Sequence, residues 1–359
     1  MARDRIYLDH AATTPVLDEA QAAMAAALGA WANPSSPHAE GRAARAAFEA
    51  ARAAIAEALD WRHDVILTSG ASEAIAMAAA HAKVRGRSLG ATEHDAVAAA
   101  MGPTAVRLPV GQDGLLDPVV LDSELAEGLA LVAIQHVNNE TGVIQPLAAI
   151  AQAVRKAGSL LLADCAQSAG KLPLAEADFI AVSAHKLGGP PGMGALLVRD
   201  IATLSPSGGQ EKGYRRGTEN LPAAAGFAAA LQSRAFADAK PRLLGLRSIV
   251  EEAIVASGGT VIAAGSERIP TIGAYAMPGV SSASQLVQFD LAGLAVSAGS
   301  ACSSGSMKAS RVLEAMRVPA EIAGSVIRVS FGPESGEEDV DRFVAEWRRM
   351  ADEARARAP

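Results

Sequence analysis

Short apolar runs alternate with alanine-rich stretches along much of the chain, beginning near Val16. The runs have the length and the flanking residues of buried strands, and they occupy 64–69, 129–135, 159–165, 178–185 and 194–199. We interpret them as parallel strands, because strands that are covered on both faces are apolar throughout. Capped helical patterns lie between them, for example at 69–83 and 146–158. This alternation predicts an α/β domain with a mostly parallel sheet.

The pattern changes after about residue 235. Strand patterns then occupy 259–265, 271–277, 294–300 and 325–332, and a charged helical pattern fills 337–358. These elements predict a smaller α+β domain. We therefore expect a large domain at 15–235 and a small domain that combines 1–14 with 236–359.

Composition and charge narrow the classes of partner. Half of the 359 residues are hydrophobic and the formal net charge is −7, so we expect no nucleic-acid partner. The chain shows neither a leader pattern nor an apolar run long enough for a membrane span, which predicts a cytoplasmic protein with no membrane partner. The two cysteines, Cys165 and Cys302, do not form a disulfide framework and lack metal-site spacing, so no metal is predicted.

Chemically competent side chains follow several of the predicted strands. Ligands of open α/β sheets bind outside the carboxyl ends of the strands, which makes these residues candidates for a site. Residues 70–72 open a helix whose free N–H groups suit a phosphate, although the same residues also serve as ordinary helix caps. Asp164 and Gln167 lie at the carboxyl end of the strand pattern at 159–165. Ser183, His185 and Lys186 lie at the carboxyl end of the pattern at 178–185.

Lys186 is the most informative of these residues. A lysine at the end of a buried strand is costly unless it is paired or used, although a snorkelling surface lysine is the ordinary alternative. An amine with a tunable pKa, a carboxylate and a phosphate cradle together match the needs of a pyridoxal phosphate site. We therefore predict that Lys186 carries this cofactor as a Schiff base.

Several motifs extend this interpretation over almost the whole chain. In order they are "YLDHAATTP", "NPSSPHAEGR", "TSGASEA", "EHDAV", "VNNETGVIQP", "DCAQSAGKLPL", "SAHKLGGPPGMGALLVR", "RRGTEN", "SAGSACSSGS" and "IRVSFG". With these motifs the chain resembles the cysteine desulfurases of the NifS and IscS type. That resemblance implies the class V variant of the aspartate aminotransferase-like fold of pyridoxal phosphate enzymes.

The resemblance also implies a role for each candidate residue. Lys186 would be the Schiff-base lysine and would move the substrate's α-proton. Asp164 would pair with the pyridine nitrogen, Gln167 would bond the phenolic oxygen, and His94 would stack on the ring and assist proton transfer. The phosphate would be held by Ala71, Ser72, Ser183, His185 and, from the second subunit of a homodimer, Thr218. The substrate carboxylate would be clamped by Asn33, Asn139 and Arg328.

The surroundings of the two cysteines predict opposite roles for them. Cys302 lies among serine, glycine and alanine, which favours an accessible and mobile thiol, whereas Cys165 directly follows an apolar strand pattern and is expected to be buried. The resemblance makes Cys302 the nucleophile that takes sulfur from L-cysteine as a persulfide and leaves L-alanine. The sulfur would pass to an acceptor or scaffold protein, for iron–sulfur cluster assembly or another thiolation.

Two alternatives remain open at this point. The chain could be a selenocysteine lyase or another class V enzyme, although an aminotransferase needs no thiol such as Cys302. It could also be a catalytically silent scaffold partner that binds pyridoxal phosphate. The joint presence of Lys186, Asp164, His94 and Cys302 argues against a silent protein.

Overall fold

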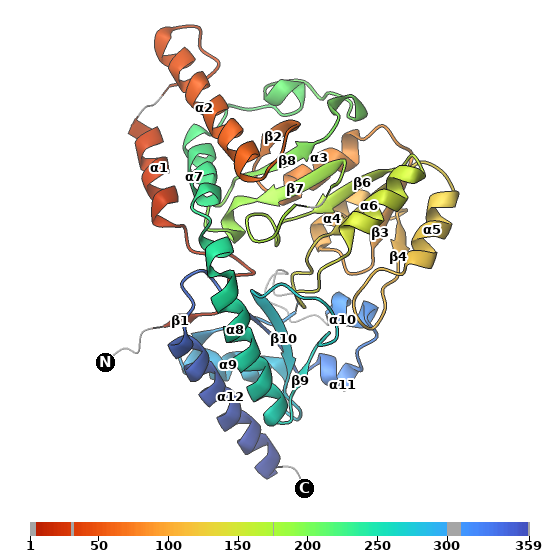
Figure 1. The fold of residues 1–359 in the computed structure, drawn as a ribbon, viewed down its shortest axis with the longest axis vertical. Coiled ribbons are helices and arrows are strands. Elements are labelled where there is room, and N and C mark those ends of the chain that lie inside the picture. The colour runs from red at the N-terminus through yellow and green to blue at the C-terminus, as the bar shows by residue number, and fades with distance from the viewer. Residues whose placement is uncertain (1–4, 30–31, 175, 300–309, 358–359) are drawn as a thin grey trace.

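The computed structural model describes residues 5–29, 32–174, 176–299 and 310–357 (Figure 1). Its largest element is a seven-stranded sheet with the order β2-β8-β7-β6-β5-β3-β4. The strands are β2 (Asp64–Thr68), β3 (Gly86–Gly90), β4 (Val106–Leu108), β5 (Ala130–Gln135), β6 (Leu160–Asp164), β7 (Phe179–Ser183) and β8 (Gly194–Val198). Strands β4, β3, β5, β6 and β7 pair in parallel, which confirms the predicted α/β class with a mostly parallel sheet.

Strand β8 corrects one expectation. The run at 194–199 was expected to be parallel, but β8 pairs antiparallel with both β7 and β2. Residues 184–193 connect β7 to β8 through a short 3₁₀ turn, η1 (Ala184–Lys186), with no crossover helix. A parallel return needs a crossover of a dozen or more residues, so this short connection reverses the strand. The reversal also places Lys186 in the turn itself.

Helices cover both faces of the large sheet (Figure 1). One face packs against α3 (Ala71–His81) and α4 (Asp95–Met101), through sheet residues such as Leu131 and Ala133. The other face packs against helices that include α6 (Leu147–Lys156), through residues such as Val132 and Ile134. Neighbouring residues of β5 thus point to opposite sides, as the strand period of two requires. The remaining helices of this region are α1 (Asp18–Gly29), α2 (Ala39–Ala58), α5 (Pro118–Ala126) and α7 (Leu221–Gln232), with 3₁₀ turns η2 (Ile201–Thr203) and η3 (Glu211–Gly213).

A smaller α+β part follows α7. Its three-stranded antiparallel sheet has the order β12-β10-β9, and a separate parallel pair joins β1 to β11. The long helices α8 and α12 run side by side in Figure 1. The strands are β1 (Ile6–Tyr7), β9 (Thr260–Val261), β10 (Ile272–Ala276), β11 (Leu294–Ala295) and β12 (Val326–Ser330). The helices are α8 (Ala235–Ala256), α9 (Ser282–Leu291), α10 (Arg311–Ala315), α11 (Ala320–Ala323) and α12 (Glu337–Arg357).

Aromatic packing joins these helices. The rings of Phe289 in α9 and Phe343 in α12 stack with their centroids 5.0 Å apart, and Trp347 is fully buried beside them. Within the described ranges, no helix combines the length and the apolarity needed to cross a membrane. The domain boundaries proposed at 14/15 and 235/236 stay a prediction.

Candidate active site

A cavity of about 380 Å³ lies where the strands of the large sheet end. Side chains from the large sheet and its loops line it together with Arg328 of the small sheet. The structure thus brings together ten of the residues predicted from the sequence: Ala71, Ser72, His94, Asn139, Asp164, Gln167, Ser183, His185, Lys186 and Arg328. Their individual roles remain predictions.

The turn that carries Lys186 is fixed by the segment preceding α1. Thr14 donates its backbone N–H to the carbonyl oxygen of His185 at 2.8 Å and its hydroxyl to that of Lys186 at 3.3 Å. Thr13 lies 3.1 Å, Oγ1 to Nδ1, from the ring of His185. These contacts hold the backbone of the turn while the Lys186 side chain lines the cavity.

Asp164 and Gln167 lie at the end of β6. The Asp164 carboxylate accepts the Ala166 N–H at 2.9 Å, and the main-chain oxygen of Asp164 accepts the His136 N–H at 2.8 Å. Gln167 donates through Nε2 to the carbonyl of Ala11 at 2.8 Å, while its buried Oε1 has no partner in the part of the chain that the structure describes. The amide nitrogen has a second N–H, so Gln167 retains capacity for a polar ligand.

The amino end of α3 makes a close contact with the sheet. A Cβ placed on Gly194 would lie 2.4 Å from the carbonyl oxygen of Val182 and 2.6 Å from the Cα of Gly70. Gly70, the N-cap residue of α3, has φ 152°, which favours glycine. These two glycines let the helix approach the strands closely, with Ser183 beside Gly70. The free N–H groups of the first helical turn therefore face the cavity region in which Ser72 lies.

The two histidines of the cavity are both held as neutral rings. His94 caps α4 by accepting the Ala96 N–H on Nδ1 at 3.1 Å, which leaves the proton of the neutral ring on Nε2. Burial and then the positive charge of Lys186 lower the pKa of His94. Burial, followed by Lys186 and Lys171, lowers the pKa of His185 to about 4. Near neutral pH, the His94 ring therefore carries no charge and can donate one hydrogen bond, from its Nε2–H.

Arg328 reaches the cavity from the middle of β12. It donates from Nη1 to the Asn139 carbonyl at 2.9 Å and from Nη2 to the Asp9 carboxylate at 2.7 Å. Its Nε is buried and has no partner among the described residues. The guanidinium is thus oriented by two contacts, while the Nε–H and the second N–H of each terminal nitrogen are not used by these contacts.

Two predicted residues are not among the residues that line this cavity, and a third lies outside the described residues. Asn33 is exposed and accepts the Ser35 N–H at 2.9 Å, away from the cavity lining. Thr218 is exposed on the segment between β8 and α7, and it does not line the cavity of its own chain. Cys302 lies outside the described residues, as does the segment 300–309 around it.

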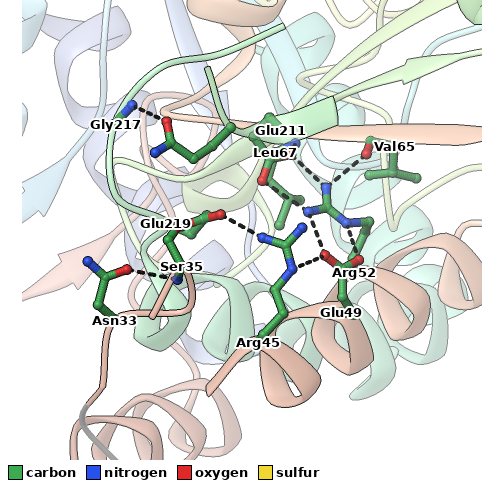
Figure 2. Close-up of polar contacts among 11 residues, drawn as sticks. Asn33, Ser35, Arg45, Glu49, Arg52, Val65, Leu67, Glu211, Gly217 and Glu219 are labelled. Atoms are coloured by element: carbon green, nitrogen blue, oxygen red, sulfur yellow. Dashed lines mark hydrogen bonds and ion pairs between the residues drawn. The ribbon is translucent and has the colours of Figure 1, made fainter. Parts of the chain in front are cut away.

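The segment that carries Thr218 is tied to α2 (Figure 2). Arg52 of α2 makes a two-pronged ion pair with Glu211, with distances of 2.6 and 3.0 Å. Arg45 donates to Glu219 at 2.8 Å. Both carboxylates are almost fully buried, so this segment has a defined place on the surface of the large domain.

Sequence reasoning missed several groups beside the cavity. Asp9 orients Arg328, Thr13 contacts His185, and Arg215 donates to Glu73 at 2.8 Å at the start of α3. The quoted motifs contain all four of these missed residues, but nothing in their spacing indicates which side chains would meet. The expectation for Cys165 is confirmed, since it is fully buried and burial raises the pKa of its thiol to about 12.

Comparisons with known proteins agree with the geometry. The model of the aminotransferase class-V family matches residues 6–343. A cysteine desulfurase from Cereibacter sphaeroides is 35% identical and covers 99% of this chain and 98% of its own length. A cysteine desulfurase IscS from Anaeromyxobacter sp. (strain Fw109-5) is 37% identical over 94% of this chain and 90% of its own.

Solved structures give the same result. A NifS-like protein from Rickettsia africae ESF-5 superposes with a TM-score of 0.88 at 29% identity, covering 97% of this chain and 99% of its own. A structure described as SspA in complex with cysteine has a TM-score of 0.76 at 26% identity, over 92% of this chain and 100% of its own. This chain therefore belongs to the class-V aminotransferase family and, within it, to the cysteine desulfurases.

Proposed function

We propose that this chain is a pyridoxal phosphate-dependent cysteine desulfurase that converts L-cysteine to L-alanine and holds the sulfur as a persulfide on Cys302. The observation that carries the proposal is the single cavity that unites Lys186, Asp164, His94 and Arg328 in a chain with cysteine desulfurases as relatives. An amine, a carboxylate, an imidazole and a guanidinium with unused N–H groups, in that order, are the chemical groups that this reaction needs.

The residues present fit the cofactor. The close approach of α3 to β8, which Gly70 and Gly194 allow, leaves N–H groups and Ser72 for the phosphate. Asp164 would hold the ring nitrogen, the second N–H of Gln167 would reach the phenolic oxygen, and Lys186 would hold the cofactor covalently. When bound, pyridoxal phosphate supplies an electron sink for negative charge at the substrate's α-carbon.

Four side chains of the protein then have separate roles in the reaction. Arg328 binds the L-cysteine carboxylate with its free N–H groups, and Lys186 takes and returns the α-proton at its Nζ. The Cys302 thiolate attacks the substrate sulfur, so an S–S bond forms as the substrate C–S bond breaks. The electron pair of that bond stays with carbon, which takes up a proton and leaves as alanine. His94 would assist this proton transfer.

Assembly and sulfur delivery belong to the same proposal. We propose a cytoplasmic homodimer in which Thr218 reaches the phosphate of the partner subunit, since Thr218 does not line the cavity of its own chain. Asn33 would help to bind the substrate carboxylate once the dimer has assembled. The persulfide would pass to an acceptor or scaffold protein, for iron–sulfur cluster assembly or another thiolation.

A single-turnover assay tests the reaction. The holoenzyme is mixed with L-cysteine, alanine is quantified, and the peptide that contains Cys302 is alkylated and weighed by mass spectrometry. We expect one alanine and one persulfide on Cys302 per active site. Lys186→Ala should lose both products and the visible absorbance of the bound cofactor, whereas Lys156→Ala on the exposed end of α6 should not. Cys302→Ala should keep the cofactor but form no alanine.

The same assay separates the alternatives. Selenocysteine turnover with negligible cysteine turnover would assign the chain to the lyases. Cofactor binding without turnover of either amino acid would identify a silent partner and refute the proposal.

A further inference from the structure

Two segments of the chain meet at the carboxylate of Glu140. Glu140 is 8% exposed, and its Oε2 accepts a hydrogen bond from the Ser310 hydroxyl at 2.6 Å. A Cβ placed on Gly299 would lie 3.6 Å from the same oxygen and 3.4 Å from the Cβ of Ser310. The chain therefore departs toward residue 300 and returns at Ser310 at one place, and Glu140 marks that place.

Glu140 is itself held firmly by the turn that follows β5. The side-chain oxygen of Asn138 accepts the backbone N–H groups of Glu140 at 3.0 Å and of Thr141 at 2.8 Å, and the Thr141 hydroxyl at 3.0 Å. Asn138 and Thr141 are both buried. The backbone of Glu140 is thus held in place, and its carboxylate in turn holds Ser310.

Ser310 is shared between this contact and a helix. Its hydroxyl donates to Glu140 and accepts the Leu313 N–H at 3.1 Å as the N-cap of α10. The next residue, Arg311, makes an ion pair with Asp95 on α4. Ser310 and Arg311 thereby contact Glu140 and Asp95, which are the sequence neighbours of two residues that line the cavity, Asn139 and His94.

We propose that Glu140 is a positioning residue for sulfur transfer, which holds Ser310 beside Gly299 and so keeps together, next to the cavity, the two ends of the segment that contains Cys302. This inference rests on the proposed function. Cys302 is three residues along the chain from Gly299 and eight from Ser310, so both of these described residues are close to it in sequence. Fastening both ends beside the cavity keeps the effective concentration of the thiol high at the substrate sulfur. Glu140 acts through the chain and needs no contact with substrate.

Two reactions of the holoenzyme separate this role from general damage to the site. Exchange of the α-hydrogen of L-alanine in heavy water needs the cofactor, Lys186 and Arg328 but no thiol. Persulfide formation in a single turnover needs all of these and Cys302. In Glu140→Ala we expect persulfide formation to fall at least about tenfold while α-hydrogen exchange stays within about twofold.

Conservative variants and a matched control sharpen the test. The amide oxygen of Glu140→Gln can still accept the Ser310 hydroxyl, so persulfide formation should fall only about two- to fivefold. Ser310→Ala should slow persulfide formation, and Ser310→Thr, which keeps a hydroxyl, should restore it. The losses of persulfide formation caused by Glu140→Ala and by Ser310→Ala should not multiply in the double variant, because both substitutions remove the same hydrogen bond. Ser281→Ala removes the equivalent N-cap of α9 and should leave both reactions unchanged.

A measurement on the cofactor-free protein tests the anchoring directly. With nitroxides on Cys302 and on Lys156→Cys, the distribution of distances should broaden when Glu140 becomes alanine. Unchanged persulfide formation, an equal fall in both reactions, or an unchanged distance distribution would each overturn the inference. If wild-type enzyme exchanges the alanine hydrogen but never forms a persulfide, the proposed function fails instead, and the distance measurement still decides the anchoring.

Discussion

At the scale of single residues, the cavity depends on side chains that are oriented by one contact and left free at another. Arg328 is the clearest case, with two nitrogens engaged and a buried Nε without a partner. Gln167 shows the same division, since its amide nitrogen is engaged and its Oε1 is not. Such groups are preorganised for a ligand, because binding costs them little further ordering.

Replacing Arg328 by lysine should raise the KM for L-cysteine by about 10- to 100-fold, with a smaller effect on kcat. An ammonium cannot hold Asn139 and Asp9 while it presents a planar pair of N–H groups to a carboxylate, and a charge-assisted hydrogen bond contributes about 1.5–3 kcal/mol. Steady-state kinetics measure the change. Arg349→Lys on the exposed face of α12 is the control, and an unchanged KM for Arg328→Lys would contradict the assignment.

The sequence indicates Arg328 but not the partner that orients it. An arginine that interrupts an apolar strand is conspicuous, so its importance can be predicted from the pattern alone. Asp9 is 319 residues away, and only the pairing of β1 with β11 and the bridge from Asp9 to Ser330 bring it into contact. Local patterns do not contain such distant contacts, which explains why Asp9 and Glu140 were missed while the strand-end residues were found.

A second prediction at this scale concerns His10. Burial, and next the charge of Lys171, lower its pKa to about 4, against about 6.5 in an unfolded chain. Between these values the unfolded chain binds one more proton at His10 than the folded protein does. This contribution to stability is therefore complete above about pH 6.5 and is lost as the pH falls toward 4.

Urea unfolding of the cofactor-free protein at several pH values measures the effect. His10→Gln should reduce the slope of unfolding free energy against pH by up to about 1.4 kcal/mol per pH unit between pH 4 and 6.5. A slope equal to that of the wild type would show that His10 does not titrate in this way.

At the scale of secondary-structure elements, the junction of α3 with β7 and β8 determines the geometry of the cavity. The apolar runs predicted the positions of all three elements, because strand and helix periods are local properties. The direction of β8 was predicted wrongly, since direction depends on the length of the connection and not on the strand's own residues.

Gly194→Ala should destabilise the protein by about 1–3 kcal/mol or more and weaken pyridoxal phosphate binding. The added methyl group would meet the Val182 carbonyl at 2.4 Å and the Gly70 Cα at 2.6 Å, and backbone atoms can only give way by moving the helix. Denaturation and cofactor titration measure the two effects.

Gly245→Ala is the matched control for this substitution. Gly245 lies within α8, and a Cβ placed there has no neighbour within 4 Å. It should be neutral or stabilising by up to about 1 kcal/mol, because alanine is the better helix former. Equal effects of the two substitutions would mean that the close approach of α3 is unimportant.

At the scale of the whole molecule, one chain does not account for every predicted site residue. Thr218 lies on an anchored surface segment and Asn33 is exposed, and neither lines the cavity. Both would be explained by a two-fold dimer in which each subunit completes the site of the other.

Complementation between two inactive variants tests the shared site. Lys186→Ala and Thr218→Asp should each be inactive alone, the second because a carboxylate would repel the phosphate. Mixed and re-assembled subunits should recover about a quarter of wild-type activity, since half of the dimers are mixed and each of these has one intact site. No recovery, despite mixed dimers shown by mass spectrometry, would place Thr218 and Lys186 in the same site. Full activity of Thr218→Asp on its own would exclude Thr218 from any site.

The pairing of Asp9 with Arg328 also has a consequence for synthesis on the ribosome. Strands β2 to β8 are complete once residue 198 has been made, so the large sheet can begin to form early. The partner of Asp9 comes 130 residues later, which takes roughly 7–26 s at common translation rates. Until then the nascent chain presents Lys186 without the arginine that we propose to bind the substrate carboxylate. We expect amino-acid turnover to begin only when translation is nearly complete.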